Sequence, residues 1–260
     1  MPLPLLHEFP LVVLSKTRSA DKRREYQCAE EAKDETRLRK LTVFAGERVA
    51  LPGAEDLEVF LALVAMSREQ GARRSFRSSQ YGLLQMLRWS GSSRRKRLAQ
   101  ALQCWRATSF VYEEEIQTAD GGSASIKLPK FTLLVPNLSK DETAFGWHEL
   151  TFNILQQAPW PALDIGKLLS LRRPTSRQLL LYLEGSGRVG EQNLRELGYE
   201  HIGISRKSSI AEVKRFVNAA AEDLVQLGYL RLCSERFRKD AKTKSWFVNL
   251  ERAAPPPALP

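Results

Sequence analysis

The sequence contains little that would support catalysis or metal binding. Its three cysteines (Cys28, Cys104 and Cys233) lie far apart without metal-ligand spacing, and its three histidines are isolated from one another. It has no glycine-rich phosphate loop and no Gly-x-Ser-x-Gly nucleophile turn. We therefore predict a protein that is not an enzyme and that needs no metal or other cofactor. The widely spaced cysteines predict buried thiols in a reducing compartment.

Long hydrophobic runs are also missing. No apolar stretch approaches the roughly 18 residues of a membrane-spanning helix. The N-terminal residues are apolar, but they lack a preceding basic segment and a small-residue cleavage site, so we predict no signal peptide. These absences predict a cytoplasmic protein without a membrane partner. The final residues, 253–260, read AAPPPALP and are typical of a disordered tail.

Acidic residues are absent from one long basic stretch. The whole chain has 40 Lys and Arg against 30 Asp and Glu, which gives a net charge of +10 and a pI of about 9.7. Residues 72–112 contain nine basic side chains and no acid, and four of the nine are consecutive at positions 94–97. Such a balance favours a polyanionic partner, and nucleic acid first of all.

The apolar spacing of the first half predicts three helices followed by a β-hairpin. This order is typical of a winged helix, in which the third helix enters a DNA groove and the hairpin forms the wing. The expected helices cover 55–71, 78–89 and 94–107, the hairpin strands cover 109–116 and 125–135, and further strands cover 7–16, 24–28 and 40–46.

The same order recurs in the second half, so we predict an α+β fold with two tandem winged-helix domains. The expected helices cover 175–187, with Thr175 or Ser176 as N-cap, a short segment ending near Gly198, and 208–228, before two strands around a basic loop within 229–250. The predicted domains are 1–147, which binds DNA and is a candidate for dimerisation, and 148–252, which also binds DNA. We expect the junction near 145–165.

The third helix of the first half presents a polar face. Leu98, Ala101, Leu102 and Trp105 have helical spacing and define an inward face, which directs four other side chains outward. Arginine can form bidentate contacts with phosphate or guanine, and glutamine can read base edges. A solvated surface is the alternative interpretation. The predicted DNA contacts here are Arg73, Arg74, Arg94, Arg95, Lys96, Arg97, Gln100 and Gln103, with Arg94 and Arg97 nearer the edges of the face.

The second half offers a similar but more diluted set of basic residues. Nearby acids (Glu212, Glu222 and Asp223) favour the solvated-surface alternative more strongly here. The predicted contacts are Arg206, Lys207, Ser208 and Ser209 at the start of the helix, Lys214, Arg215 and Asn218 on its outer face, and Arg236, Arg238, Lys239, Lys242 and Lys244 in the wing.

Several stretches resemble the plasmid replication initiator protein A family, in the same order along nearly the whole chain. The most specific piece is LLSLRRPTSRQLLLYLEG, residues 168–185, where Ser170, Pro174, Thr175, Arg177, Tyr182 and Leu183, with Leu179 or Leu180, match the family pattern. Weaker matches are FPLVVLSK (9–16), REY (24–26), EDLEVFLALVAM (55–66) and LRELGYEHIGIS (194–205).

The resemblance implies a bacterial plasmid replication initiator that binds repeated double-stranded DNA sites at an origin. It also implies a host initiator and the replicative helicase as partners, repression of the protein's own promoter, and a homodimer in one of its states. Three alternatives stay open: a winged-helix transcription regulator, a nicking enzyme, and an RNA-binding or architectural protein. The chain lacks the His-hydrophobe-His pair that a nicking enzyme needs, whereas direct repeats beside the coding region would favour an initiator over a regulator.

Overall fold

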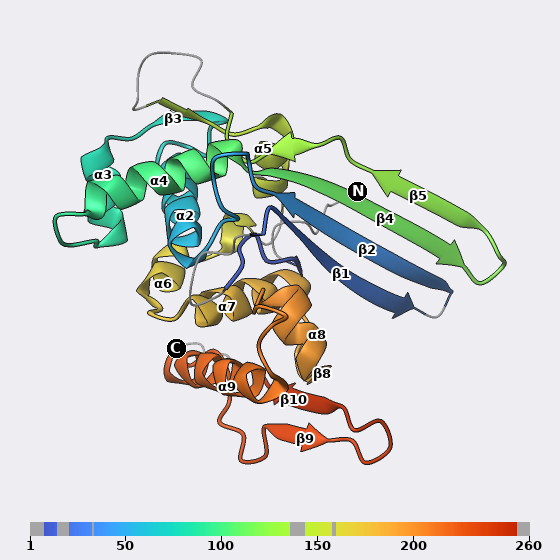
Figure 1. Ribbon diagram of the computed structural model, residues 1–260. Coiled ribbons are helices and arrows are strands. Elements are labelled where there is room, and N and C mark those ends of the chain that lie inside the picture. Colours follow the sequence, from blue (N-terminus) through green and yellow to red (C-terminus); the bar gives the residue numbers. More distant parts are fainter. Residues whose placement is uncertain (1–7, 15–20, 33, 136–143, 158–159, 254–260) are drawn as a thin grey trace, which may run out of the picture.

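A computed structural model describes residues 8–14, 21–32, 34–135, 144–157 and 160–253 (Figure 1). Its fold is mixed α/β, with small antiparallel sheets and intervening helices. The largest sheet has the strand order β1-β2-β4-β5, and β6 also pairs with β4. These strands are β1 (Arg23–Ala32), β2 (Glu35–Phe44), β4 (Ser109–Thr118), β5 (Ser123–Lys127) and β6 (Phe131–Thr132).

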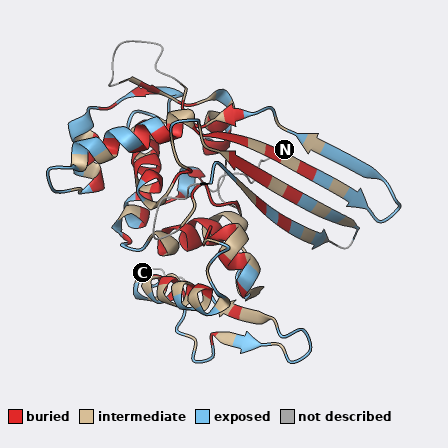
Figure 2. Ribbon diagram, viewed as in Figure 1, coloured by how far each residue is buried: buried red, intermediate tan, exposed pale blue. Residues whose placement is uncertain are grey.

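Three helices pack beside this sheet in the first half: α2 (Ala54–Glu69), α3 (Gln80–Leu87) and α4 (Arg94–Ala107). Helix α2 is buried on most sides, including Leu57, Phe60 and Leu63, so it forms the centre of this half (Figure 2). The predicted helix 94–107 matches α4, and the predicted helix 55–71 differs from α2 by one or two residues. The short strand β3 (Ser75–Arg77) pairs with β7 (Ala144–Gly146).

The predicted junction contains more regular structure than expected. It holds α5 (Glu149–Leu155) and the 3-10 turn η1 (Trp160–Ala162), and α6 (Ile165–Ser170) directly follows it. Trp160 is fully buried, and its ring meets Phe60 of α2 edge-on at a centroid distance of 5.9 Å. The segment is therefore packed against α2 instead of spanning a gap.

The second half repeats helices and a small sheet. Its elements are α7 (Pro174–Ser186), β8 (Gly190–Asn193), α8 (Leu194–Glu196), the π-turn η2 (Leu197–His201), α9 (Ile210–Gln226), β9 (Phe237–Lys239) and β10 (Trp246–Leu250). The sheet order is β8-β10-β9. Helix α9 buries Val213, Val217, Ala220 and Leu224, as the spacing predicts.

The predicted strand at 7–16 is wrong over the residues described there, 8–14. Leu14 makes only an isolated bridge with Ile204, and its amide donates to the carbonyl of Gly203 at 2.8 Å. Phe9, Leu11 and Val12 are all buried, so the segment lacks the two-sided pattern of a half-buried strand. Pro10, which has no amide hydrogen, further prevents a continuous ladder.

Smaller corrections concern element ends. Pro129 interrupts the expected strand 125–135, which becomes β5 and β6. Helix α7 begins with Pro174 at its first position and Arg173 as N-cap, so neither Thr175 nor Ser176 caps it. The short segment expected to end near Gly198 continues as η2 to His201.

Both halves contribute to one buried hydrophobic cluster. The predicted domain limits at 147 and 148 stay a prediction, and the expected tail lies outside the described residues apart from Ala253.

Cys28 and Cys104 are buried as predicted, and burial raises the pKa of the Cys28 thiol to about 12. Cys233 is only half-buried. Within the described residues no helix is long and apolar enough to cross a membrane.

Candidate nucleic-acid interface

Helix α4 presents the polar face that its sequence predicts. Leu98, Ala101, Leu102 and Trp105 are buried, and the Trp105 indole donates to the Asp56 carbonyl oxygen at 2.6 Å. This contact fixes the rotation of α4 on α2. The side chains that this rotation leaves exposed are Arg95, Lys96, Gln100 and Gln103.

The basic side chains at the start of α4 are not neutralised by the protein. The side chains of Arg94, Arg95 and Lys96 make no hydrogen bond or ion pair with any residue that the structure describes. No acidic side chain lies in the first turn, and Ser93 does not cap it with a side-chain hydrogen bond. Cations here oppose the helix dipole, so this charge costs stability unless an external anion is bound.

Arg97 belongs to a different environment from its neighbours. Its guanidinium forms two hydrogen bonds with the Glu55 carboxylate, at 2.6 and 3.2 Å, and lies 4.4 Å from the centre of the Trp89 ring. The side chain therefore fastens α4 to α2 and to the preceding loop. Its predicted role as a DNA contact competes with these intramolecular contacts.

The two arginines before α3 also differ from each other. Arg73 is exposed and has no side-chain partner among the described residues. Arg74 donates to the Trp147 carbonyl oxygen at 3.4 Å and lies 3.7 Å from the Glu149 carboxylate. Arg73 is thus the freer of the two predicted contacts.

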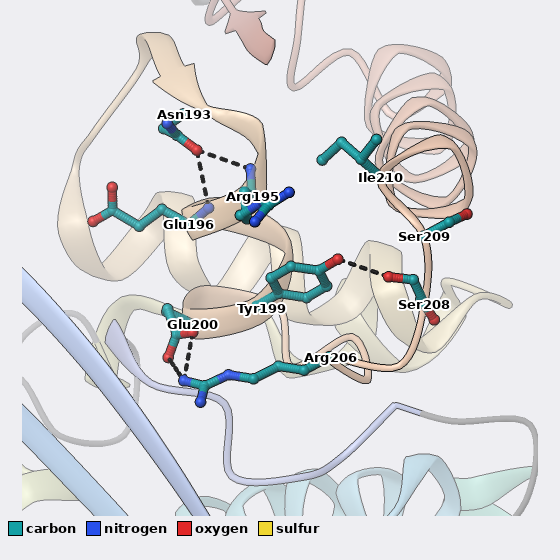
Figure 3. A pocket seen from close by; sticks show the side chains of 9 residues that line it. All are labelled: Asn193, Arg195, Glu196, Tyr199, Glu200, Arg206, Ser208, Ser209 and Ile210. Atoms are coloured by element: carbon teal, nitrogen blue, oxygen red, sulfur yellow. Dashed lines mark hydrogen bonds and ion pairs between the residues drawn. The ribbon is translucent and has the colours of Figure 1, made fainter. Parts of the chain in front are cut away.

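In the second half the start of α9 borders an open pocket of about 660 Å³ (Figure 3). Ser209 caps α9 in a capping box with Glu212, so its hydroxyl already accepts from the Glu212 amide at 3.3 Å. The Ser208 carbonyl oxygen accepts a 2.7 Å hydrogen bond from the Tyr199 hydroxyl. Both predicted serines therefore hold the pocket wall in place.

Two arginines line this pocket, and only one was predicted. Arg206 is bound to the Glu200 carboxylate at 2.7 and 2.9 Å, and Glu200 also accepts from the Gln27 amide of β1 at 3.0 Å. Arg195 is exposed, and its side chain has no partner among the described residues. Sequence reasoning missed Arg195 because its segment was not expected to border the start of α9.

The outer face of α9 is held by neighbouring side chains. The Lys214 ammonium lies 4.0 Å from the centre of the Trp246 ring. The Asn218 side chain donates to Glu222 at 2.7 Å and accepts from Arg236 at 3.2 Å. Arg236 is only 7% exposed, so its predicted contact with DNA competes with its burial and with its hydrogen bond to Asn218. Arg215 is exposed.

Strands β9 and β10, which were predicted to form a wing, carry one neutralised arginine, and the loop between them is more open. Arg238 forms two hydrogen bonds with Glu191 of β8, at 2.5 and 3.0 Å, and they hold the pKa of the Glu191 carboxyl below its ordinary value. Lys239 is exposed, with its ammonium 5.9 Å from the Trp246 ring centre. Lys207, Lys242 and Lys244 are exposed, and their side chains have no partner among the described residues.

The two candidate surfaces therefore differ in how much of their charge is free. Around α4 several cations lack a carboxylate partner among the described residues, whereas around α9 Arg206 and Arg238 are each held by one. The described residues contain no group of three or more His, Cys, Asp or Glu side chains arranged to hold a metal ion. The residues that the structure brings together suit the binding of an extended anion.

Comparison with known proteins identifies the fold. No protein-family model matches the chain, and no curated protein matches it. It is similar to a crystal structure of selenomethionine derivatives of domains 2 and 3 of RctB, with a TM-score of 0.64, 10% identity, and coverage of 98% of this chain and 100% of that one. A second structure of RctB domains 2–3 has a TM-score of 0.56, 12% identity, and coverage of 96% and 97%. The chain shares the fold of these two domains.

Proposed function

We propose that the protein is a replication initiator that binds repeated double-stranded DNA sites at an origin. The observation that carries the proposal is the exposed face of α4, on which the side chains of Arg95 and Lys96 have no partner among the described residues. The fold shared with the RctB domains, which belong to a replication initiator, supports the replication role.

In this proposal both halves act as winged helices. Helices α4 and α9 enter successive major grooves, and the loop between β9 and β10 lies along a phosphate backbone. Arg95 and Lys96 neutralise phosphates, while Gln100 and Gln103 contact base edges. The protein acts without nucleotide hydrolysis, because its contribution is DNA binding and the recruitment of other proteins.

The finer parts of the proposal come from the plasmid-initiator resemblance. They are a plasmid origin in a bacterial cytoplasm, repression of the protein's own promoter, a homodimer as one state, and the host initiator and replicative helicase as partners. The match between LLSLRRPTSRQLLLYLEG and that family supports them.

Salt titration of duplex binding tests the phosphate contacts of α4. We expect Arg95→Ala and Lys96→Ala to weaken binding to all sequences and to flatten the slope of log affinity against log salt by about one unit for each phosphate contact. Gln100→Ala, on the same face, should keep the slope and lose about 1–3 kcal/mol of sequence preference. An unchanged affinity and slope in both cation variants would exclude α4 as the DNA-binding helix.

A further inference from the structure

The first turn of α7 contains the motif that most resembles the initiator family, yet none of its residues is a predicted DNA contact. Arg177 is only 5% exposed and Ser176 is fully buried. Polar side chains at such positions need partners, because an unpaired buried polar group is costly. Their partners are Glu58 on α2, the Leu168 carbonyl oxygen on α6, which accepts from Arg177 Nε at 3.2 Å, and Asp223 on α9. Contacts with three helices give the turn a definite structural position.

On one side, Arg177 connects α7 to α4 through α2. Its guanidinium donates to Glu58 Oε1 at 2.7 Å, and Glu58 Oε2 accepts from the Trp89 indole at 2.8 Å. The Arg97 guanidinium of α4 lies 4.4 Å from the centre of the Trp89 ring. Four side chains therefore form a continuous chain of contacts from α7 to the basic helix α4.

On the other side, the same turn holds α9. Ser176 Oγ donates to Asp223 Oδ2 at 2.6 Å, and Arg173 pairs with the other oxygen of the same carboxylate. Arg173 also donates to the Ala219 carbonyl oxygen at 3.3 Å. Asp223, which appears in the sequence as an acid that dilutes a basic surface, instead fastens α9 to α7.

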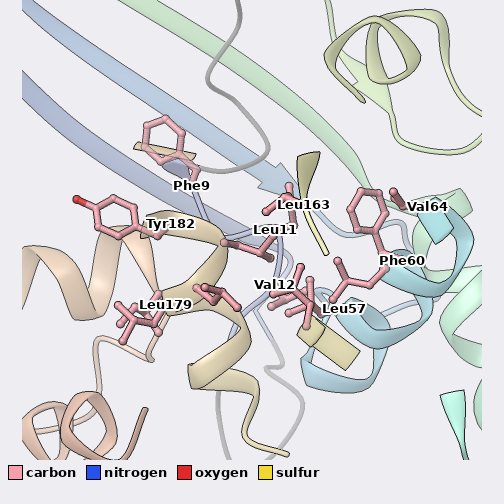
Figure 4. Close-up of a cluster of buried hydrophobic side chains, with 14 of the residues drawn as sticks. Phe9, Leu11, Val12, Leu57, Phe60, Val64, Leu163, Leu179 and Tyr182 are labelled. Carbon is pink, nitrogen blue, oxygen red and sulfur yellow. The ribbon is translucent and has the colours of Figure 1, made fainter. Parts of the chain in front are cut away.

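Helices α2 and α7 lie between α4 and α9 (Figure 1), and apolar side chains fill the space around them (Figure 4). Leu57 and Phe60 of α2 and Leu179 and Tyr182 of α7 belong to this core. Apolar contacts are non-directional, whereas charged hydrogen bonds fix both distance and angle. The polar contacts at the first turn of α7 are therefore suited to set the orientation of the two helices.

We propose that the first turn of α7, Arg173–Arg177, is a bracket that fixes α4 relative to α9 and thereby sets the spacing of the two DNA segments that one molecule binds. This inference rests on the proposed function. The bracket residues are positioning residues, because their side chains contact α2, α6 and α9. One inserted base pair moves the second segment by about 3.4 Å and rotates it by about 36°, so a rigid bracket makes binding depend steeply on spacing.

The DNA test begins by selecting duplexes with the full-length wild-type chain from a random library, and then inserts one to three base pairs between the two protected segments. We expect wild-type affinity to fall about tenfold or more with such insertions. Arg177→Met should keep its affinity nearly constant across the series. Arg172→Met is the matched control, since Arg172 is exposed and has no side-chain partner among the described residues. An Arg177→Met protein with wild-type dependence on spacing would overturn the bracket.

A second measurement needs no DNA. Spin labels at Gln103→Cys on α4 and Ala211→Cys on α9, in a Cys233→Ser background, report the distance between the helices. We expect Arg177→Met to broaden or shift that distance distribution and Arg172→Met to leave it unchanged. An unchanged distribution in Arg177→Met overturns the bracket. If Arg177→Met does not fold, Glu58→Gln and Ser176→Ala replace it, because the amide oxygen that Glu58→Gln introduces can still accept from the Trp89 indole.

The two measurements separate failure of the bracket from failure of the proposed function. If the wild-type chain selects no duplex, DNA binding is excluded, and the spin labels still decide whether the first turn of α7 holds α4 and α9 together. If it selects duplexes but tolerates every insertion, the DNA-binding proposal stands and a spacing set by Arg177 is excluded.

Discussion

Neighbouring arginines on α4 illustrate how one type of residue acquires two roles. Arg95 is exposed without a partner among the described residues, whereas Arg97 is held by Glu55 and by the face of Trp89. The positions are two residues apart, which on a helix directs their side chains to different faces. The charge of Arg95 is therefore available to a ligand, and that of Arg97 is already used within the protein.

This contrast predicts different effects of two alanine substitutions. Arg97→Ala should lower the free energy of unfolding by about 1 kcal/mol, because it removes a cation–π contact and a partly exposed ion pair. Arg95→Ala should change it by less than about 0.5 kcal/mol, since it removes only solvated atoms. Urea denaturation followed by circular dichroism measures both. Equal losses of stability would mean that Arg95 also makes a structural contact.

At the scale of elements, the beginning of α9 combines a structural cap with a predicted DNA contact. Ser209 accepts from the Glu212 amide, and the Glu212 carboxylate accepts from the Ser209 amide at 3.0 Å. Ser209→Ala should therefore lower the free energy of unfolding by about 1 kcal/mol. Ser208→Ala is the matched control, because the side chain of Ser208 has no partner among the described residues. A thermal melt that shifts equally for both variants contradicts the cap.

The long helices could be predicted from the sequence, because the spacing of apolar residues that defines a helix lies within each segment. The spacing of Leu98, Leu102 and Trp105 is sufficient to predict α4 and its buried face. The prediction of a strand at 7–16 is wrong over residues 8–14, because apolar residues in this pattern suit a strand as well as an irregular buried segment. The backbone partners of Leu14 in this segment are Ile204 and Gly203, which are about 190 residues away in sequence. Local sequence therefore does not determine whether the segment joins a sheet.

The candidate site was only partly predictable, because contacts between distant segments cannot be read from the local sequence. The exposure of Arg95, Lys96 and Gln100 follows from helical periodicity alone. The engagement of Arg206 with Glu200, of Arg238 with Glu191, and of Arg236 with Asn218 depends on how separate elements meet in space. Charge counts along the sequence therefore overestimated the free cationic charge around α9.

At the scale of the whole molecule, the contacts between the two halves include two sets that involve different elements. One is formed by α2 with α6 and α7, and it includes the Arg177–Glu58 pair. The other joins the N-terminal segment and β1 to the second half, where the His201 ring contacts the Glu8 carbonyl oxygen at 2.8 Å and Glu30 pairs with Arg188 at 3.0 Å. Two such contacts resist both hinge motion and twisting more than one would.

These contacts predict that the protein unfolds in one transition. Separating the halves would expose Phe9, Leu11 and Leu179 to water and would leave the Arg177 guanidinium without the Glu58 carboxylate. Both changes cost free energy, so an intermediate with only one folded half is unfavourable. Tryptophan fluorescence of a Trp246→Phe variant reports the first half, because the remaining tryptophans lie at or before position 160 and Trp160 itself packs on Phe60 of α2. A solvatochromic dye on Cys233 reports the second half. We expect the two urea midpoints to coincide. Separate midpoints would show that the predicted domains 1–147 and 148–252 unfold independently, and the buried contacts between them would then contribute little to stability.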